Sequence, residues 1–181
     1  MLQLTIKETE LFDEATNRRV RTKGATIKLE HSLVSLSKWE SKWKVPFLST
    51  ENKTREMMID YARCMTITQN VDPNVYNGLT GEHMKMLEDY INDKMSATTF
   101  KNLGNGKKNT SVTTAEIIYY WMVSLQIPFE PCEKWHLNRL LTLIRVCDEK
   151  GSPKKKMSRR EALQQQKSLN AARRAKYHTK G

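Results

Sequence analysis

Long hydrophobic runs are missing from this 181-residue sequence, and so are the features of a secretory signal. The longest apolar run, residues 117–123, is far shorter than the roughly 20 residues that a helix needs to cross a bilayer. Residues 1–8 contain neither a basic start nor an extended apolar stretch. We therefore expect no membrane attachment and no secretion, and we place the protein in the cytoplasm.

Paired cysteines are also missing. The sequence has three cysteines, an odd number, and they lie far apart at Cys64, Cys132 and Cys147. None belongs to a C-x-x-C pair or has metal-ligand spacing with a histidine. A disulfide framework is therefore not expected, and free thiols suit a reducing compartment.

The residue patterns of known catalytic and metal sites are absent as well. No H-E-x-x-H motif or paired spacing links the four histidines, His31, His83, His136 and His178. No G-x-S-x-G, no G-x-G-x-x-G and no aspartate-rich cation loop occurs. We predict a protein that is not an enzyme and holds no metal or cofactor. Side chains that converge only in the folded chain escape such a search, so an enzyme is kept as an alternative.

One segment resembles a phosphate-binding loop without meeting its requirements. A P-loop ends in Gly-Lys followed by Ser or Thr, but here Gly106-Lys107 is followed by Lys108. No buried strand precedes it. Residues 96–110 are rich in Gly, Asn and Lys, and we predict a surface loop there.

The formal net charge of +11 is distributed unevenly along the chain. Residues 151–181 hold ten Lys or Arg and one acid, a net charge of +9. The other 21 of the 31 basic residues and 19 of the 20 acidic residues give residues 1–150 a charge of only +2. The asymmetry indicates a basic tail that makes electrostatic contacts separately from a nearly neutral body.

Residues 1–30 alternate with the two-residue period of β-strands. The alternating apolar residues are Leu2, Leu4 and Ile6, and then Ala25, Ile27 and Leu29. A polar stretch with turn residues, 13–23, lies between them. We predict two or three short strands in one small antiparallel sheet.

Residues 31–150 fit a series of amphipathic helices, because their apolar residues recur three and four positions apart. The first helix carries Trp39 and Trp43 and must end before Pro46. Asp72-Pro73 opens a short helical turn, and residues 137–147 form the most regular apolar stripe. The predicted fold class is mainly α (α+β): a body at 1–150, with a small sheet in 1–30 and helices in 31–150, and a basic helical tail at 151–181.

Helix starts are predicted at polar capping residues. Ser49 or Thr50 is expected to cap a helix that ends near residue 66, and Thr80 is expected to cap another. Thr113 and Glu116 have the spacing of a capping box. The helix that follows this box is apolar on most sides, so we expect it at the centre of the core.

Two tryptophans on the first helix are candidate partner-binding residues. Trp39 and Trp43 share one helix face and are flanked by Lys38 and Lys42. Burial in the core is the ordinary role of tryptophans at helical spacing. Two indoles with a rim of lysines are also suited to contact a partner helix.

The basic tail offers a second candidate surface, with Ser158 and Glu161 as a capping box at its start. Its cations can follow a phosphate backbone or contact an acidic partner, whereas a solvated helix that keeps the protein soluble is the plain alternative. Its apolar content is too thin for insertion into a membrane surface. The candidate residues are Lys154, Lys155, Lys156, Arg159, Arg160, Lys167, Arg173, Arg174 and Lys176.

Several stretches resemble a group of small proteins encoded by long-tailed, siphovirus-type bacteriophages, the tail assembly chaperones. The matching blocks are EHSLVSLSKWE at 30–40, CMTITQNVDP at 64–73, WHLNRLLTLIRVC at 135–147 and LNAARR at 169–174. The resemblance covers nearly the whole chain. It implies a protein without catalytic residues or metal that binds the long, apolar, helical tape-measure protein in the bacterial host cytoplasm before the tail tube polymerises.

Two other functions are kept as alternatives to this expectation. One is a nucleic-acid-binding or packaging accessory that acts through the basic tail. The other is a structural virion protein of the tail or its connector. Self-association of the chain is a further expectation.

Overall fold

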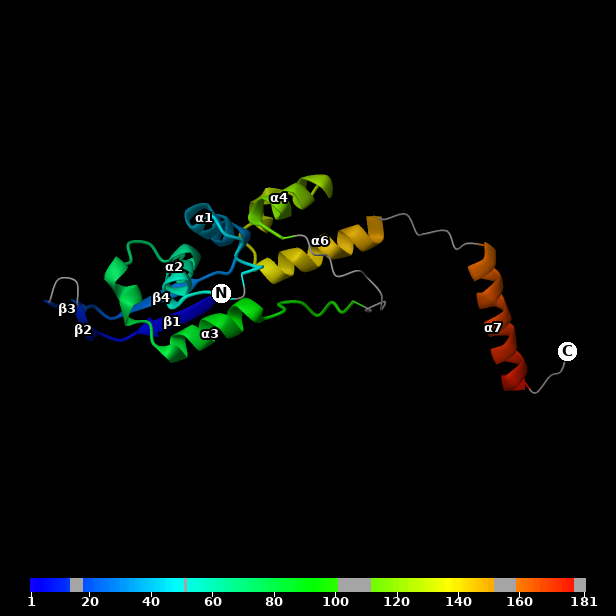
Figure 1. Cartoon of the computed structure of the whole chain (residues 1–181), viewed down its shortest axis with the longest axis horizontal. Coiled ribbons are helices and arrows are strands. Elements are labelled where there is room, and N and C mark those ends of the chain that lie inside the picture. The colour runs from blue at the N-terminus through cyan, green and yellow to red at the C-terminus, as the bar shows by residue number, and fades with distance from the viewer. Residues whose placement is uncertain (14–17, 51, 101–111, 152–158, 178–181) are drawn as a thin grey trace. The chain divides into compact units, whose positions relative to one another are not determined.

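The computed structural model describes residues 1–13, 18–50, 52–100, 112–151 and 159–177. The chain forms two units, Met1–Asp148 and Glu149–Gly181, and each is described by itself. The division falls inside a helix, two residues before the expected boundary at residue 150. Helices dominate, with a small antiparallel β element near the N-terminus, as the sequence predicted (Figure 1).

The predicted pairing of the two alternating segments is confirmed. Strand β1 (Leu2–Ile6) runs antiparallel to β4 (Ala25–Leu29), with Leu4 opposite Ile27. The inward side chains Leu4, Ile6, Ile27 and Leu29 are buried, Leu2 and Ala25 on the same side are partly buried, and the alternate residues are exposed. The other edge of β4 is extended by the chain after residue 65, where the Ile67 N–H donates to the Lys28 carbonyl.

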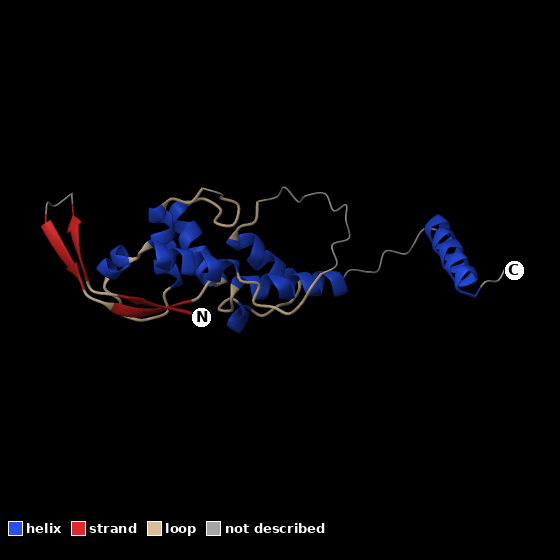
Figure 2. Ribbon diagram, turned by 90° about the horizontal axis from the view of Figure 1, so that it is seen from below, coloured by secondary structure: helices blue, strands red, loops and turns tan. Residues whose placement is uncertain are grey.

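The prediction of a single sheet is wrong, because the polar stretch between these strands forms its own ladder. Strand β2 (Thr9–Asp13) pairs antiparallel with β3 (Arg18–Thr22), and the two ladders are separate. The Thr22 hydroxyl, fully buried, donates to the Thr9 carbonyl over 2.8 Å at the base of this hairpin. In both views the hairpin lies at the end of the unit, beyond the helices (Figure 2).

An aromatic cluster lies in the core between the first two helices, α1 (Leu33–Trp43) and α2 (Arg55–Met65). The Phe47 ring stacks on Tyr61 with centroids 3.8 Å apart, and Trp39 meets Tyr61 edge-on at 6.3 Å. Trp39 and Tyr61 are both fully buried. The predicted end of α1 before Pro46 is confirmed, because Lys44 adopts the left-handed conformation as its C-cap.

The start of α2 differs from the prediction. Its N-cap is Thr54, whose side chain accepts from the Met57 N–H, and not Ser49 or Thr50. Thr50 is used elsewhere, because its hydroxyl donates to the Pro46 carbonyl over 2.6 Å in the turn after α1.

The middle of the chain follows the predicted caps. The 3₁₀ helix η1 (Pro73–Gly78) begins at Asp72, which accepts from the Asn74 N–H. Helix α3 (Gly81–Asn92) begins at Thr80, which forms a capping box with His83. Leu87 and Tyr90 are the buried residues of α3.

The last helices of the first unit are α4 (Ala115–Ser124), the short α5 (Phe129–Cys132) and α6 (Leu137–Gly151). The apolar stripe of α6 is confirmed, with Leu137, Leu140 and Ile144 buried. The expected position of α4 at the centre of the core is wrong. Ala115, Ile118 and Met122 are buried, but Tyr120 is 67% exposed and Val123 is 62% exposed.

The predicted capping box of α4 is also wrong. The N-cap is Thr114, which makes no side-chain capping bond. A carboxylate from α1 replaces it: Glu40 Oε2 accepts from the Ala115 N–H at 2.7 Å, and Glu40 Oε1 accepts from the Phe47 N–H at 2.9 Å. Glu40 is 7% exposed, so this contact joins α1 to α4 inside the core.

In the part of the second unit that the structure describes, the chain beyond α6 forms helix α7 (Arg159–Tyr177), as the sequence predicted. The described side chains of α7 are all exposed. The predicted cap at Ser158 and the lysines at residues 154–156 lie outside the described residues.

Candidate partner-binding surfaces

Trp39, one of the two predicted contact residues, belongs to the core. Its side chain is fully buried, its Nε1–H donates to the Met57 carbonyl over 3.0 Å, and its ring packs edge-on against Phe47 at 5.0 Å. The prediction of a surface patch that includes Trp39 is therefore wrong. The physical reason is that α2 packs over this face of α1.

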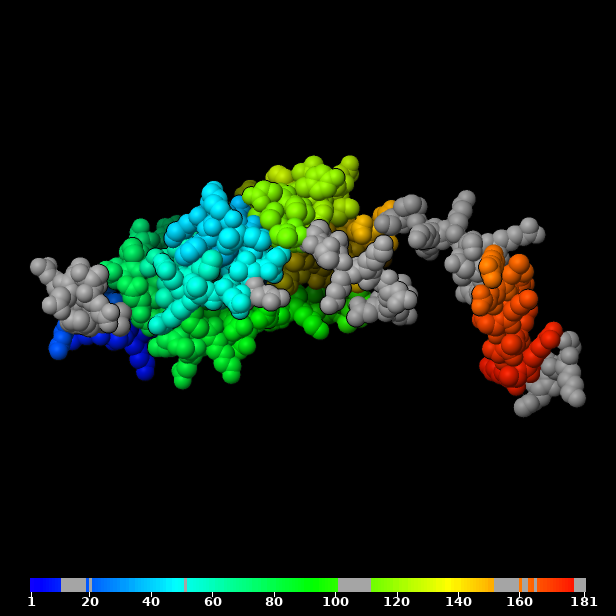
Figure 3. Space-filling view, viewed as in Figure 1, coloured from blue at the N-terminus to red at the C-terminus, as the bar shows by residue number. Residues whose placement is uncertain are grey.

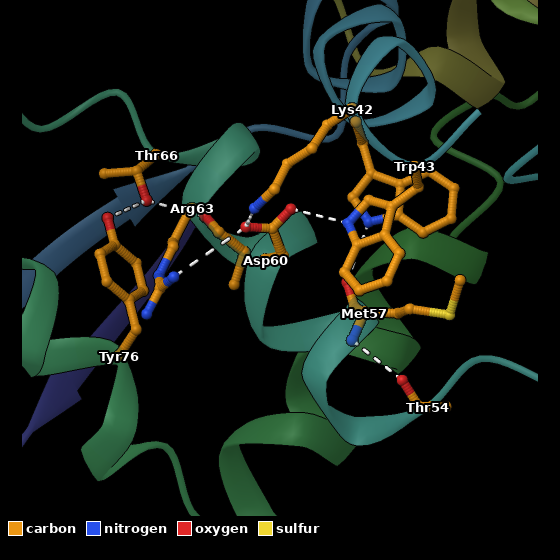
Figure 4. Close-up of polar contacts among 10 residues, drawn as sticks. Lys42, Trp43, Thr54, Met57, Asp60, Arg63, Thr66 and Tyr76 are labelled. Carbon is orange, nitrogen blue, oxygen red and sulfur yellow. Dashed lines mark hydrogen bonds and ion pairs between the residues drawn. The ribbon is translucent and has the colours of Figure 1, made fainter. Parts of the chain in front are cut away.

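Trp43 lies at the margin of the same contact and is half-buried. Its ring stacks on Trp39 with centroids 6.0 Å apart, and its Nε1–H donates to Asp60 Oδ2 over 2.8 Å. Lys42 Nζ reaches the other carboxylate oxygen, Asp60 Oδ1, at 2.5 Å (Figure 4). Lys38 is exposed.

Asp60 of α2 is the centre of this cluster and is 5% exposed. Burial alone would raise its pKa. The hydrogen bonds from Lys42 and Trp43 and the positive charges of Lys42 and Arg63 outweigh burial, and they lower the pKa of Asp60 below its ordinary value. Asp60 therefore stays ionised and fixes the Lys42 and Trp43 side chains on the body.

A hollow of about 470 Å³ lies beside this cluster, and its cations are already engaged within the chain. Arg55 Nη2 donates to the Leu79 carbonyl at 2.9 Å. The Arg63 guanidinium lies 5.4 Å from the centre of the Tyr76 ring, whose hydroxyl donates to Thr66 Oγ1 (Figure 4). The cations that line the hollow are thus engaged in ion pairs and hydrogen bonds within the chain, and the hollow is not an open charged site.

The buried histidines are held by hydrogen bonds. His31 Nδ1 lies 2.6 Å from the Tyr61 hydroxyl. His136 Nε2 lies 3.0 Å from the Tyr90 carbonyl oxygen, and its ring is 5.1 Å from that of His31. The three cysteines are free thiols. Among the described residues, no three His, Cys, Asp or Glu side chains come together as metal ligands would.

An apolar groove of about 730 Å³ lies between α4 and α6. In the space-filling view, α4 (yellow-green) forms an outer surface of the unit (Figure 3). Exposed Tyr120 lies on the wall that α4 contributes. The groove residues are Tyr120, Trp121 and Ser124 of α4, its C-cap Leu125, and Leu141, Ile144, Arg145 and Asp148 of α6.

Sequence reasoning missed this groove, although α4 contains a signal for it. Residues 117–123 are apolar on nearly every side of the helix, and this pattern predicts burial at the centre of the core. A helix at the edge of a fold shows the same pattern when its outward face is an interaction surface. Sequence alone cannot separate the two cases, because the packing partner of each face is set by tertiary structure.

The predicted tail residues within the described part of the second unit lie on α7. Arg159 begins the helix, and the exposed cations along it are Arg160, Lys167, Arg173, Arg174 and Lys176. Lys154, Lys155 and Lys156 precede it and lie outside the described residues.

In the described part of the chain, no helix is both long enough and apolar enough to span a bilayer. Comparisons with protein-family models, with curated proteins and with solved structures find no match to the chain.

Proposed function

We propose that the chain is a tail assembly chaperone of a long-tailed bacteriophage, and that its α4–α6 groove receives an apolar helical segment of the tape-measure protein. The sequence blocks at 30–40, 64–73, 135–147 and 169–174 suggest the family. The observation that carries the proposal is the groove itself, with Tyr120 exposed beside Trp121 and Leu141.

The shape and lining of the groove favour a helix as its occupant. Two helices form its walls, and a third helix packs against such a pair at 8–10 Å between axes as a general rule. The groove residues run from Tyr120 to Ser124 on α4 and from Leu141 to Asp148 on α6, so they span about 6 Å and about 10.5 Å, which is one to two helical turns.

The groove lining also favours an apolar occupant. Aromatic side chains such as Tyr120 and Trp121 are typical anchors of protein interfaces. Arg145 and Asp148 line the same groove, so an apolar segment with polar ends would fit it.

The proposed role requires binding and release without covalent chemistry, and it is exercised in the cytoplasm of the bacterial host. Exposed apolar helices of a long tape-measure protein aggregate unless they are covered. A chaperone of this kind covers them until the tail tube assembles around them, and it is then absent from the finished particle. Its absence from purified virions distinguishes it from a structural tail or connector protein.

The test is co-expression of the full chain with the tape-measure protein of the same phage. The wild-type chain is expected to raise the soluble fraction of the tape-measure protein and to co-purify with it. Tyr120→Glu places a charge in the groove and is expected to abolish both effects. Met86→Glu is the matched control, because Met86 is 46% exposed on α3, outside the groove, and this variant should behave as wild type.

Two results would contradict the proposal. One is a tape-measure protein whose solubility does not change with the wild-type chain. The other is equal loss of co-purification with both variants, because this would mean that the α4–α6 groove is not the binding surface.

A further inference from the structure

Three of the cations of α7 lie in a row along one side of the helix. Arg160, Lys167 and Arg174 are separated by seven residues each, and all three are exposed. Seven residues turn an α-helix by about 20° less than two full turns, so the three side chains stay close to one line. At 1.5 Å of rise per residue they stand about 10.5 Å apart and span about 21 Å.

Two further cations lie away from this row, nearer the C-terminal end of the helix. By the 100° turn of each residue, Arg173 and Lys176 point roughly 120° and 180° from the direction of the row. Residues 159–177 contain six bases and the single acid Glu161, a net charge of +5. The helix therefore carries positive charge on two flanks.

The large apolar side chains described on α7, Leu163, Leu169 and Tyr177, do not form a continuous stripe. Leu163 and Leu169 are both half-exposed and stand six residues apart, so they point about 120° away from each other. A helix that docks on a protein groove or a lipid surface needs a continuous apolar face. The partner of α7 must therefore be recognised mainly by its negative charge.

We propose that α7 binds double-stranded DNA by lying in the major groove, with its cations on the phosphates of both walls and without reading sequence. An α-helix is 10–12 Å wide with its side chains, and the major groove of B-DNA is about 12 Å wide. Phosphates border that groove on both sides, which matches the two charged flanks of α7. The deep, narrow major groove of an RNA duplex does not admit a helix, so DNA is preferred over duplex RNA.

This activity is separate from the proposed binding of the tape-measure protein in the α4–α6 groove. Tyr120→Glu is accordingly expected to leave DNA binding unchanged. A failure of either proposal leaves the other standing, because each depends on a different unit of the chain.

The experiment measures fluorescence anisotropy of a labelled 20-base-pair DNA duplex with the full chain, from 50 to 200 mM KCl. If α7 neutralises five or six phosphates, its affinity for DNA should fall roughly a thousand-fold between 50 and 200 mM KCl. In the triple variant R160Q/K167Q/R174Q, two or three contacts remain, so the fall should shrink to about 10- to 40-fold. Glutamine is a good helix former, so the substitutions preserve the helix.

The matched control is K28Q/K85Q/K94Q, which removes the same charge from exposed positions of the first unit. It is expected to keep the wild-type salt dependence. Unlabelled duplex RNA and polyglutamate are the competitors, and both should displace the DNA only at far higher phosphate or carboxylate concentrations than unlabelled DNA.

Four outcomes would overturn the proposal. The first is undetectable binding at 50 mM KCl, and the second is binding that does not weaken with salt. The third is an equal effect of the two triple variants, which would mean that total charge and not α7 attracts DNA. The fourth is displacement by RNA duplex or polyglutamate as effectively as by DNA.

Discussion

At the scale of single residues, the core contains a histidine whose surroundings oppose its positive charge. His31 is 1% exposed, and its Nδ1 contacts the Tyr61 hydroxyl. Burial, and secondly the neighbouring His136, lower the pKa of His31 to about 3. The His136 ring is fixed in place beside it, because Asn138 N lies 3.3 Å from His136 Nδ1 and His136 Nε2 lies 3.0 Å from the Tyr90 carbonyl oxygen.

This arrangement predicts that the protein loses stability as the pH falls below 6.5. The unfolded chain takes up a proton on His31 near its ordinary pKa of 6.5, whereas the folded chain does so only near 3. Protons therefore favour unfolding throughout this window, and the free energy of unfolding should fall by up to about 1.4 kcal/mol for each pH unit. Urea unfolding at a series of pH values between 4.5 and 7.5 measures this change in the free energy of unfolding.

The comparison for His31 is the variant His31→Gln, which keeps a polar group beside the Tyr61 hydroxyl and cannot titrate. Its free energy of unfolding should depend on pH less steeply than that of the wild type. The His136 ring lies 5.1 Å from that of His31, so the difference between the two curves measures His31 together with its coupling to His136. Parallel curves would refute the assignment.

At the scale of elements, the caps show which starts of helices can be predicted from local sequence. The helix starts at Thr80 and Asp72 are predictable because each residue caps its helix with its own side chain, which accepts from an N–H two or three residues away. The start of α4 was misassigned because its cap comes from Glu40, which is 75 residues away in the sequence. A local pattern contains no information about such a partner.

The strands likewise show what can and cannot be predicted from local sequence. The pairing of β1 with β4 follows from the alternation of buried residues such as Leu4 and Ile27. The β2–β3 hairpin has fewer apolar residues, and its register sets Glu10 opposite Arg21. Charged cross-strand pairs stabilise a β-ladder. They produce no alternation of apolar residues in the sequence from which the strands could be predicted.

The capping of α4 by Glu40 predicts a large difference between two substitutions. Glu40→Ala leaves the Phe47 and Ala115 N–H groups buried without an acceptor, at about 1–3 kcal/mol for each group. Glu40→Gln keeps one acceptor oxygen and should destabilise the body by roughly half as much. Urea unfolding of both variants measures the difference. Equal losses would mean that the side chain contributes by packing and not as an acceptor.

At the scale of the whole molecule, the segregation of charge was predicted in full, because it needs only the order of residues. The site was predicted less well. The spacing of Trp39 and Trp43 predicts a contact surface, yet Trp39 is buried and Trp43 is fixed by Asp60. Tyr120 was overlooked since its exposure depends on how α4 packs. The order of residues locates charge along a chain, but only the tertiary structure shows which apolar helix face is exposed to solvent.

The two units should differ greatly in local stability. Every described side chain of α7 is exposed, whereas α1 buries Leu33, Leu36 and Trp39. An isolated helix of 19 residues is only marginally stable, so its amides open at almost no cost in free energy. The amides of α1 open only when the body unfolds, which costs 5–15 kcal/mol in typical domains.

Hydrogen exchange followed by mass spectrometry should therefore show full exchange in residues 159–177 within seconds, and slow exchange in residues 33–43. Adding the 20-base-pair DNA duplex should slow exchange in α7 alone, because the helix becomes ordered when it binds and its amides then open less often. R160Q/K167Q/R174Q serves as the control and should show little slowing. Strong protection of α7 in the free chain would mean that the helix is already packed, and the separation of a stable body from a marginal basic helix would then be wrong.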